Sequence, residues 1–239
     1  NFYAQASGKT GVVNLHVAPG LGNGLGMTYN ALKANAPLIV TAGQQDTRMR
    51  LRNPLLGHDL AAMAKAVTKW SVQVERADEM ADIMRRAFKI AHTPPAGPVF
   101  VALPIDVMEQ ETANPARAAG PLYMASSPDP AAIRLAAERL SRATAPTIIA
   151  GDDIARAGAS PALLELAEAL GAPIWVEGLR AQAVAPSAHP LMRGALPLEA
   201  GQIARALHGA DCLLLVGGPF FEEVWFDDAS PFPPGAAIL

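Results

Sequence analysis

Cysteine is nearly absent from this chain, which carries a single thiol among 239 residues. One thiol cannot form an internal disulfide, so the sequence is unlike a disulfide-stabilised secreted domain and suits a reducing, cytoplasmic setting. The residue, Cys212, lies in the apolar run Cys212–Val216, where a buried structural thiol is more common than a nucleophile. We therefore expect a cytoplasmic protein whose chemistry does not depend on cysteine.

Long apolar runs and an excess of one charge are also lacking. No stretch reaches the roughly 20 apolar residues that a membrane-spanning helix needs. The net charge is −3, and the 19 lysines and arginines are scattered instead of forming the basic stripe that binds nucleic acid. We expect neither a membrane nor a nucleic acid as a partner.

Several well-known catalytic motifs are missing. The sequence has no G-x-x-x-x-G-K-[ST] phosphate loop, no H-E-x-x-H zinc motif and no G-x-S-x-G nucleophile turn. The G-x-G-x-x-G dinucleotide fingerprint also fails, because the sixth place counted from Gly20, Gly22 or Gly24 is never glycine. The five histidines do not have the spacing of a zinc site. We therefore predict no metal ligand in this chain, and no P-loop nucleotidase or serine hydrolase of the G-x-S-x-G type.

What the sequence does contain is a series of short apolar runs bounded by glycine or proline. Each has the length of a strand and is apolar on both faces, as parallel strands covered by helices on either side are. The segments between the runs supply those helices, with apolar stripes at helical spacing. The pattern predicts an α/β protein with two doubly wound parallel-sheet domains. The predicted strands are Val12–Leu15, Leu38–Thr41, Val99–Leu103, Thr147–Ala150 and Cys212–Val216, and the predicted helices are Asp78–Ile90, a segment capped by Asp129, and Pro161–Leu170.

Helical and strand periodicity disappear between Pro104 and Pro128, where small and polar residues predict a poorly structured connection. Both domains are expected to be incomplete. Asn1–Ser7 is typical of the last turns of a helix, and Ala236–Leu239 is typical of a strand that has just begun. The predicted organisation is a first domain over 1–108, a linker over 109–128 and a second domain over 129–239.

His16 differs from the other histidines because it follows a buried strand and precedes the glycine-rich stretch Ala18–Gly26. The carboxyl ends of parallel strands are where α/β folds place their ligands. The glycines predict a turn whose N–H groups lie ahead of the next helix, where they could hold the polar atoms of a ligand. Close packing is the other interpretation of the glycines, and a structural role at a strand end is the other interpretation of His16.

Several ordered motifs resemble the thiamine diphosphate-dependent 2-oxo-acid decarboxylases, and among these most of all the benzoylformate decarboxylases. The resemblance covers essentially the whole chain, and the order of the motifs makes it more specific than any one of them. The matching stretches are NLHVAPGLGN at 14–23, APLIVTAGQQ at 36–45, GPVF at 97–100 with Pro104, PTIIAG at 146–151, LAEALGAP at 166–173, His189–Pro190 and DCLLLVGG at 211–218.

The resemblance implies a fold, a reaction and a cofactor. The family has three α/β domains, and this chain resembles most of the pyrimidine-binding domain and part of the middle domain. A cofactor-activating glutamate would precede Asn1, and the domain that binds Mg²⁺ and the diphosphate would follow Leu239. The full-length parent would be a lyase that converts a benzoylformate-like 2-oxo acid to an aldehyde and CO₂ with thiamine diphosphate, as a homodimer or homotetramer. The 239 residues alone would be inactive.

The same resemblance assigns roles to particular residues. His16 matches an active-site histidine, which suits the proton transfers of the reaction. The stretch from Gly20 and Gly22 to Asn23 matches a segment that comes near the cofactor. Leu55 and Leu56 match apolar residues that help to enclose the aryl group of the substrate, although core packing is the other interpretation of both leucines.

One departure from the family pattern bears on the reaction. The stretch Phe220–Phe226 offers Val224 where benzoylformate decarboxylases have a second active-site histidine. The exact substrate and the proton relay are therefore open. A carboligase similar to acetolactate synthase is one alternative, and a non-catalytic fragment that only binds a ligand is another.

Overall fold

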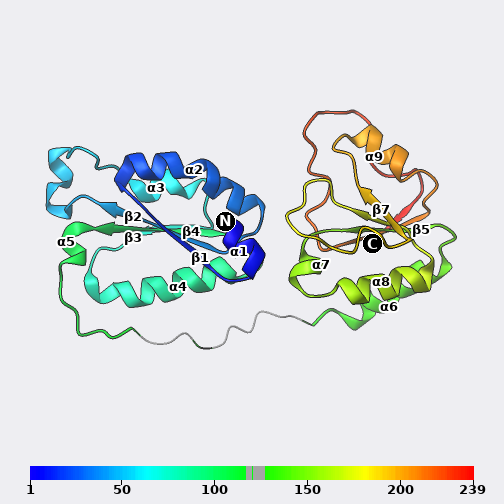
Figure 1. Ribbon diagram of the computed structural model, residues 1–239, viewed down its shortest axis with the longest axis horizontal. Coiled ribbons are helices and arrows are strands. Elements are labelled where there is room, and N and C mark those ends of the chain that lie inside the picture. Colours follow the sequence, from blue (N-terminus) through cyan, green and yellow to red (C-terminus); the bar gives the residue numbers. More distant parts are fainter. Residues whose placement is uncertain (117–119, 121–126) are drawn as a thin grey trace. The chain divides into compact units, whose positions relative to one another are not determined.

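The computed structural model describes residues 1–116, 120 and 127–239, which belong to two compact units, Asn1–Ala125 and Ser126–Leu239. Each unit has one sheet of parallel strands with helices on both faces (Figure 1). This arrangement confirms the predicted α/β fold. The division between the units falls inside the segment 109–128 that we predict as a linker.

The first unit contains a four-stranded sheet with the strand order β1-β2-β4-β3, in which all neighbours are parallel. Figure 1 shows α2 and α3 on one face of this sheet and α4 on the other. The strands are β1 (Gly11–Leu15), β2 (Leu38–Gln44), β3 (Trp70–Gln73) and β4 (Pro98–Pro104), and the helices are α1 (Phe2–Ser7), α2 (Val17–Lys33), α3 (Leu60–Lys65), α4 (Met80–His92), α5 (Ile105–Met108) and the 3-10 turns η1 (Thr47–Arg52) and η2 (Ala77–Glu79).

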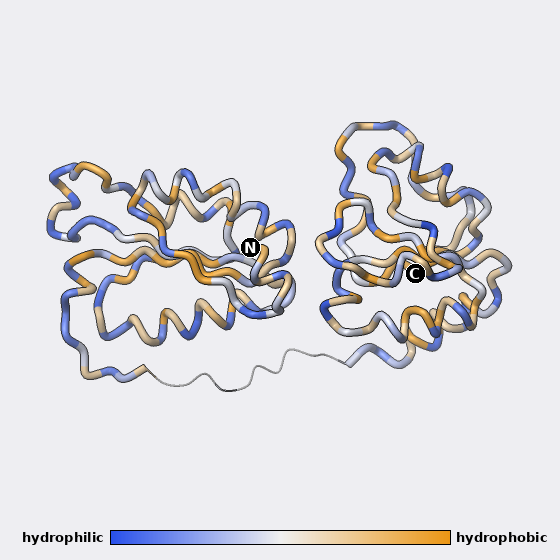
Figure 2. The backbone as a smooth tube through the Cα atoms, viewed as in Figure 1, coloured by the Kyte–Doolittle hydropathy of each residue, from blue (hydrophilic) through white to orange (hydrophobic). Residues whose placement is uncertain are grey.

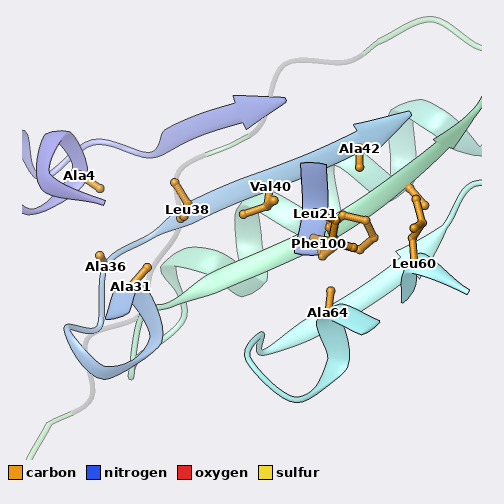
Figure 3. Close-up of a cluster of buried hydrophobic side chains, with 11 residues drawn as sticks. Ala4, Leu21, Ala31, Ala36, Leu38, Val40, Ala42, Leu60, Ala64 and Phe100 are labelled. Carbon is orange, nitrogen blue, oxygen red and sulfur yellow. The ribbon is translucent and has the colours of Figure 1, made fainter. Parts of the chain in front are cut away.

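The core of the first unit explains why β2 is buried at nearly every position and begins with the apolar run Leu38–Val40. Leu38 and Val40 point to the α2 and α3 side, where they pack with Leu21 and Phe100 (Figure 3). Ile39 points to the α4 side and belongs to a separate cluster with Val99 and Ala87. Since successive side chains alternate between the faces of a strand, only a strand covered on both sides is apolar throughout. Phe100 is completely buried, and truncating such a side chain to alanine typically costs about 3–5 kcal/mol.

The second unit contains a five-stranded parallel sheet with the order β7-β6-β5-β8-β9. Apolar residues concentrate in the strands of both sheets (Figure 2). Ile148 packs toward α8 and Ile149 toward α9, so the alternation seen in β2 recurs in β5. The strands are β5 (Pro146–Ala150), β6 (Ile174–Val176), β7 (Met192–Ala195), β8 (Cys212–Val216) and β9 (Ala237–Ile238), and the helices are α6 (Pro130–Arg142), α7 (Asp153–Arg156), α8 (Ser160–Leu170) and α9 (Ala200–Ala206).

The five strands predicted from apolar runs are present, and so are the predicted helices. The Asp129 carboxylate accepts the N–H of Ala131 at 2.8 Å and caps α6 as expected. Three strands have no counterpart in the prediction, namely β3, β6 and β7. Within the predicted structureless connection, Ile105–Met108 forms the short helix α5. Residues 117–119 and 121–126 of the predicted linker lie outside the described residues.

The predicted glycine-rich turn is wrong, because α2 begins at Val17 and runs through all the glycines. The N–H of Gly20 is already bonded to the His16 carbonyl at 2.8 Å, so it is not free to bind a ligand. Close packing is the interpretation that fits one of these glycines: a Cβ on Gly24 would lie 2.7 Å from Cδ1 of Leu15. The side chain of Leu15 would therefore have to shift to make room for a side chain at this position.

Across the residues that the structure describes, no helix has both the length and the apolar character needed to cross a membrane.

Candidate functional site

His16 lies where β1 ends and α2 begins, as the N-cap residue of that helix. Its backbone is extended, with φ −95° and ψ 103°, and its side chain makes no capping hydrogen bond. The residue is exposed to solvent. The fold thus presents the imidazole at the carboxyl edge of the sheet without using it to cap the helix.

Asn23 and Gly20 follow His16 at helical spacing, so the three residues share one face of α2. A Cβ on Gly20 would lie 3.4 Å from the Cβ of His16, so a side chain at this position would lie in contact with the histidine. Gly22 lies on a different face, and a Cβ there would meet nothing within 4 Å. The structure therefore brings His16, Gly20 and Asn23 together and sets Gly22 apart from them.

Leu55 and Leu56 lie in the loop between β2 and α3, and this loop reaches the start of α2. The N–H of Ala18 donates to the carbonyl of Leu56 at 3.4 Å, which places Leu56 close to the helix turn that follows His16. Leu55 is 85% exposed and Leu56 is 37% exposed. Core packing therefore does not account for Leu55, and it accounts for Leu56 only in part.

Backbone strain marks the same contact. Val17 has φ +43° and Leu56 has φ +69°. Both angles lie in the left-handed region, which residues other than glycine, asparagine and aspartate rarely adopt. A β-branched residue such as valine is especially disfavoured there. Strained residues of this kind each cost about 1–3 kcal/mol and cluster at functional sites, because the surrounding structure must hold them in place. One of the two strained residues directly follows His16, and the other accepts the N–H of Ala18.

Two glutamines that sequence reasoning did not select hold the loop. The side-chain N–H of Gln45 donates to the carbonyl of Leu55 at 3.0 Å, and that of Gln44 donates to the carbonyl of His58 at 2.5 Å. Gln44 is buried, and its amide oxygen also accepts the N–H of Gln45 at 2.9 Å. The sequence feature that could have identified this pair is its position at the end of a buried strand, at the same edge of the sheet as His16.

The other end of the loop is bonded to α5, which directly follows β4. The Asp106 carboxylate accepts both the N–H of Thr47 at 3.0 Å and its hydroxyl at 2.5 Å. Burial opposes ionisation of Asp106, but the two bonds from Thr47 outweigh it and hold the pKa of this carboxyl below its usual range. A cavity of about 600 Å³ borders Gln44, Gln45 and Thr47. Hydrogen bonds, more than core packing, therefore fix the loop that carries the leucines.

The second unit has its own potential ligand position between β5 and β8, where the order of strands along the sheet reverses. Open α/β sheets bind ligands at such a reversal, beyond the carboxyl ends of the strands. Here two glycines fill it, since a Cβ on Gly151 would lie 2.1 Å from the carbonyl oxygen of Gly217. This backbone contact leaves no room for a side chain at Gly151.

Val224 belongs to a solvent-exposed apolar group in the second unit. Val224 is 52%, Trp225 62% and Phe226 90% exposed, and we call these three residues the apolar tip. The N–H of Val224 donates to the carbonyl of Leu198 at 3.3 Å, which fixes the start of the tip. The tip therefore offers an apolar surface and no titratable side chain.

In the part of the chain that the structure covers, no group of three or more His, Cys, Asp and Glu side chains is placed to hold a metal ion. The expectation that Mg²⁺ ligands lie outside this chain stays a prediction.

Comparison with known proteins defines the class. Residues 1–64 match the model of the N-terminal TPP binding domain of thiamine pyrophosphate enzymes, and residues 133–239 match the model of their central domain. The chain belongs to the thiamine pyrophosphate enzymes. The parallel α/β units and the site at the carboxyl edge of the first sheet agree with this membership.

Individual relatives include both a decarboxylase and a synthase. The chain is 35% identical to the benzoylformate decarboxylase of Pseudomonas aeruginosa, over 99% of this chain and 46% of that protein. It is 30% identical to a probable acetolactate synthase large subunit of Methanocaldococcus jannaschii, over 99% of this chain and 41% of the relative. The crystal structure of benzoylformate decarboxylase from Polynucleobacter necessarius superposes with a TM-score of 0.93 at 32% identity, covering 99% of this chain and 45% of that one. The chain thus spans less than half the length of these relatives.

Proposed function

We propose that this chain is part of a thiamine diphosphate-dependent lyase that converts a benzoylformate-like 2-oxo acid to an aldehyde and CO₂. The observation that carries the proposal is the contact between the start of α2 and the loop between β2 and α3 that carries Leu55 and Leu56, which we call the leucine loop. The N–H of Ala18, two residues after the exposed His16, donates to the carbonyl of Leu56, and Leu56 and its neighbour Leu55 are partly or largely exposed, which supports a shared pocket. A substrate with an aryl group beside a ketone needs both a proton-transfer group and an apolar wall.

The residues around His16 are chemically suited to the cofactor's pyrimidine. An aminopyrimidine ring has both donor and acceptor atoms on its edge, and the exposed amide of Asn23 offers both as well. Gly20 keeps the space beside His16 free of a side chain, and the open surface at Gly22 lets a ligand approach the helix backbone. When bound, thiamine diphosphate supplies a nucleophilic carbon and an electron sink. We assign Asn23, Gly20 and Gly22 to cofactor binding.

His16 is the proposed catalytic residue. Imidazole is the side chain best suited to accept and return a proton near neutral pH, and decarboxylation requires protonation of the carbon that loses CO₂. We propose that His16 moves this proton and that Leu55 and Leu56 enclose the aryl group. We also propose Mg²⁺ ligands outside this chain, a homodimer or homotetramer and a cytoplasmic location.

The test uses the protein encoded by the complete reading frame, incubated with thiamine diphosphate, Mg²⁺ and benzoylformate. We expect release of CO₂ and benzaldehyde, with kcat lowered about 10²–10⁴-fold in His16→Ala, the usual contribution of general acid–base catalysis. His208→Ala is the matched control, because His208 is exposed and belongs to the second unit. Failure of the unsubstituted protein to turn over any 2-oxo acid would refute the proposal.

A carboligase similar to acetolactate synthase is the second candidate. It is favoured by Val224, which lies at the position matched to a histidine of the decarboxylases, and by the 30% identity to the archaeal synthase. Product analysis with pyruvate separates the two, since a carboligase gives acetolactate and a decarboxylase gives acetaldehyde. Calorimetric titration of the chain with thiamine diphosphate tests the third possibility, a module that binds the ligand without chemistry.

A further inference from the structure

Strand β1 is exposed on both faces, although it belongs to a sheet of parallel strands. Val12 is 64% and Val13 38% exposed, and successive side chains of a strand point to opposite faces. Parallel sheets are normally covered on both faces, as β2 is in this sheet. The apolar side chains of β1 therefore lack the cover that those of β2 have.

The outer edge of β1 also presents main-chain groups that can pair with a further strand. β1 stands first in the order β1-β2-β4-β3, so β2 is its single neighbour in the described sheet. The N–H of Gly11 donates toward β2, to the carbonyl of Pro37 at 3.1 Å. The N–H and C=O groups of alternate residues point to opposite sides of a strand, so those of Val12 and Asn14 point away from β2. An edge of this kind is a template for strand pairing.

A cavity of about 490 Å³ lies beside the same edge. Val12 and Val13 of β1, Phe2 of α1 and Met27 of α2 belong to its mostly apolar lining. Phe2 is 83% and Met27 60% exposed. A strand that pairs with a sheet edge gains affinity from main-chain bonds and specificity from pockets for its side chains. The edge and the cavity together therefore fit an apolar strand.

The helices of this sheet report the direction of each step between strands. Connections between parallel strands are right-handed in about 98% of cases, so the face on which a helix lies follows from the direction of the step. The steps from β1 to β2 and from β2 to β3 run the same way along the sheet, and their helices α2 and α3 cover one face (Figure 1). The step from β3 to β4 runs back, and its helix α4 covers the other face. The three connections thus have the same hand.

Helix α1 lies on the face that α2 and α3 cover. Its Ala4 is buried in one cluster with Leu21 of α2 and Leu38 of β2 (Figure 3). A helix on this face marks a step in the direction from β1 to β2, so a strand that precedes α1 belongs beyond β1, on the side of the open edge. The chain spans less than half the length of its relatives, which leaves length for such a strand in the complete protein.

We propose that the part of the complete protein that precedes α1 supplies a parallel strand, which pairs with the outer edge of β1 and fills the apolar cavity beside it. β1 is then an interior strand of a larger sheet, which explains why it is apolar on both faces. The pairing is independent of the proposed function, because it follows from the sheet alone. A second copy of the chain and a different protein are the competing occupants of this edge.

Hydrogen exchange in the 239-residue chain and in the complete protein tests the pairing. The amides of Val12 and Asn14 should exchange fast in the 239-residue chain and at least about 100-fold more slowly in the complete protein. The amide of Val13 faces β2 and is the internal control, which should be slow in both. Fast exchange at Val12 and Asn14 in the purified complete protein would overturn the proposal. Slow exchange in the 239-residue chain would also overturn it, and dependence on protein concentration would identify a second copy as the occupant.

A charged substitution tests whether the edge is buried in the complete protein. Val12→Lys should lower the Tm of the complete protein by about 5 °C, because it places a charge under the added strand, and should leave the Tm of the 239-residue chain nearly unchanged. Leu51→Lys is the matched control, because Leu51 is 96% exposed and lies outside β1, and it should change neither Tm. Equal shifts for Val12→Lys in the two proteins would overturn the proposal.

Discussion

The N–H of Ala18 donates to the carbonyl oxygen of Leu56 across 3.4 Å and joins the start of α2 to the loop after β2. Both ends of this contact are strained, because Leu56 itself and Val17, the neighbour of Ala18, have positive φ angles. The loop that contains Leu56 is held by the side chains of Gln44, the last residue of β2, and Gln45, which directly follows it. A local contact at His16 therefore depends on residues that are distant in sequence.

Leu56→Gly should be more stable than Leu56→Ala. Both substitutions lose the same partly buried side chain, but glycine adopts φ +69° without steric cost, so strain of about 1–3 kcal/mol is relieved, against about 0.5–1 kcal/mol of added chain entropy in the unfolded state. We expect the free energy of unfolding in urea to be about 1 kcal/mol higher for Leu56→Gly than for Leu56→Ala. Leu51 is the control position, because it is 96% exposed and has no positive φ, and there glycine should be slightly less stable than alanine. A Leu56→Gly variant less stable than Leu56→Ala would contradict the assignment of strain.

Gln44→Ala should loosen the leucine loop without unfolding the unit. The substitution leaves the carbonyl of His58 without its donor in a partly buried position, at a cost of about 1–3 kcal/mol. Hydrogen exchange of the amides at 55–60 should accelerate, while exchange in β4 stays slow. Gln73→Ala is a suitable comparison, since the side chain of Gln73 donates to the exposed carboxylate of Glu75 and to no other residue in the described ranges. Unchanged exchange in the loop of Gln44→Ala would show that the glutamine does not hold it.

The sequence predicts those strands that are buried on both faces of a sheet. It predicts the candidate site only in part. The strand around Leu38–Thr41 is apolar at nearly every position, whereas β3 contains Ser71 and Gln73, is half-exposed and has only one neighbouring strand, so its sequence lacks that signal. The glycines of α2 lower its intrinsic helix propensity, which is why a turn was predicted there. Helix α2 forms nevertheless, and at Gly24 it packs closely against Leu15. The partners of Gln44 and Gln45 lie 14 and 10 residues further along the chain, in the irregular loop that follows β2, and sequence periodicity carries no information about such pairs.

The glycines of α2 should respond to alanine in different ways. A Cβ on Gly26 would meet nothing within 4 Å, so Gly26→Ala should stabilise the chain by about 0.5–1 kcal/mol through helix propensity. A Cβ on Gly24 would lie 2.7 Å from Cδ1 of Leu15, so Gly24→Ala should be less stable than Gly26→Ala by about 1–3 kcal/mol. Urea unfolding of the two variants tests this, and equal stabilities would contradict close packing at Gly24.

Gly22 is as open as Gly26, so Gly22→Ala should stabilise the chain equally. It should nevertheless weaken thiamine diphosphate binding if the proposed cofactor role is correct.

Glu177 should make the stability of the chain fall as the pH rises. Burial raises the pKa of its carboxyl above the ordinary value of 4.5, and so does the neighbouring Glu222 carboxylate to a smaller extent, while the N–H groups of Phe221, Gly178 and Glu222 offset part of this effect. The folded chain therefore binds this proton more tightly than the unfolded chain does. Between the unfolded and the raised folded pKa, the folded state holds more protons, so the free energy of unfolding decreases with increasing pH.

Glu177→Gln removes this titration, so comparison of its unfolding free energy with that of the unsubstituted chain isolates the contribution of Glu177. The advantage of the unsubstituted chain over Glu177→Gln should be greatest at the acid end of the window that begins near pH 4.5 and should decline as the pH rises through it. Glu223→Gln, at an exposed position of the same loop, should keep the pH dependence of the unsubstituted chain. A difference between the chain and Glu177→Gln that stayed constant or grew with pH would mean that the N–H donors outweigh burial, and the carboxyl would then have a lowered pKa.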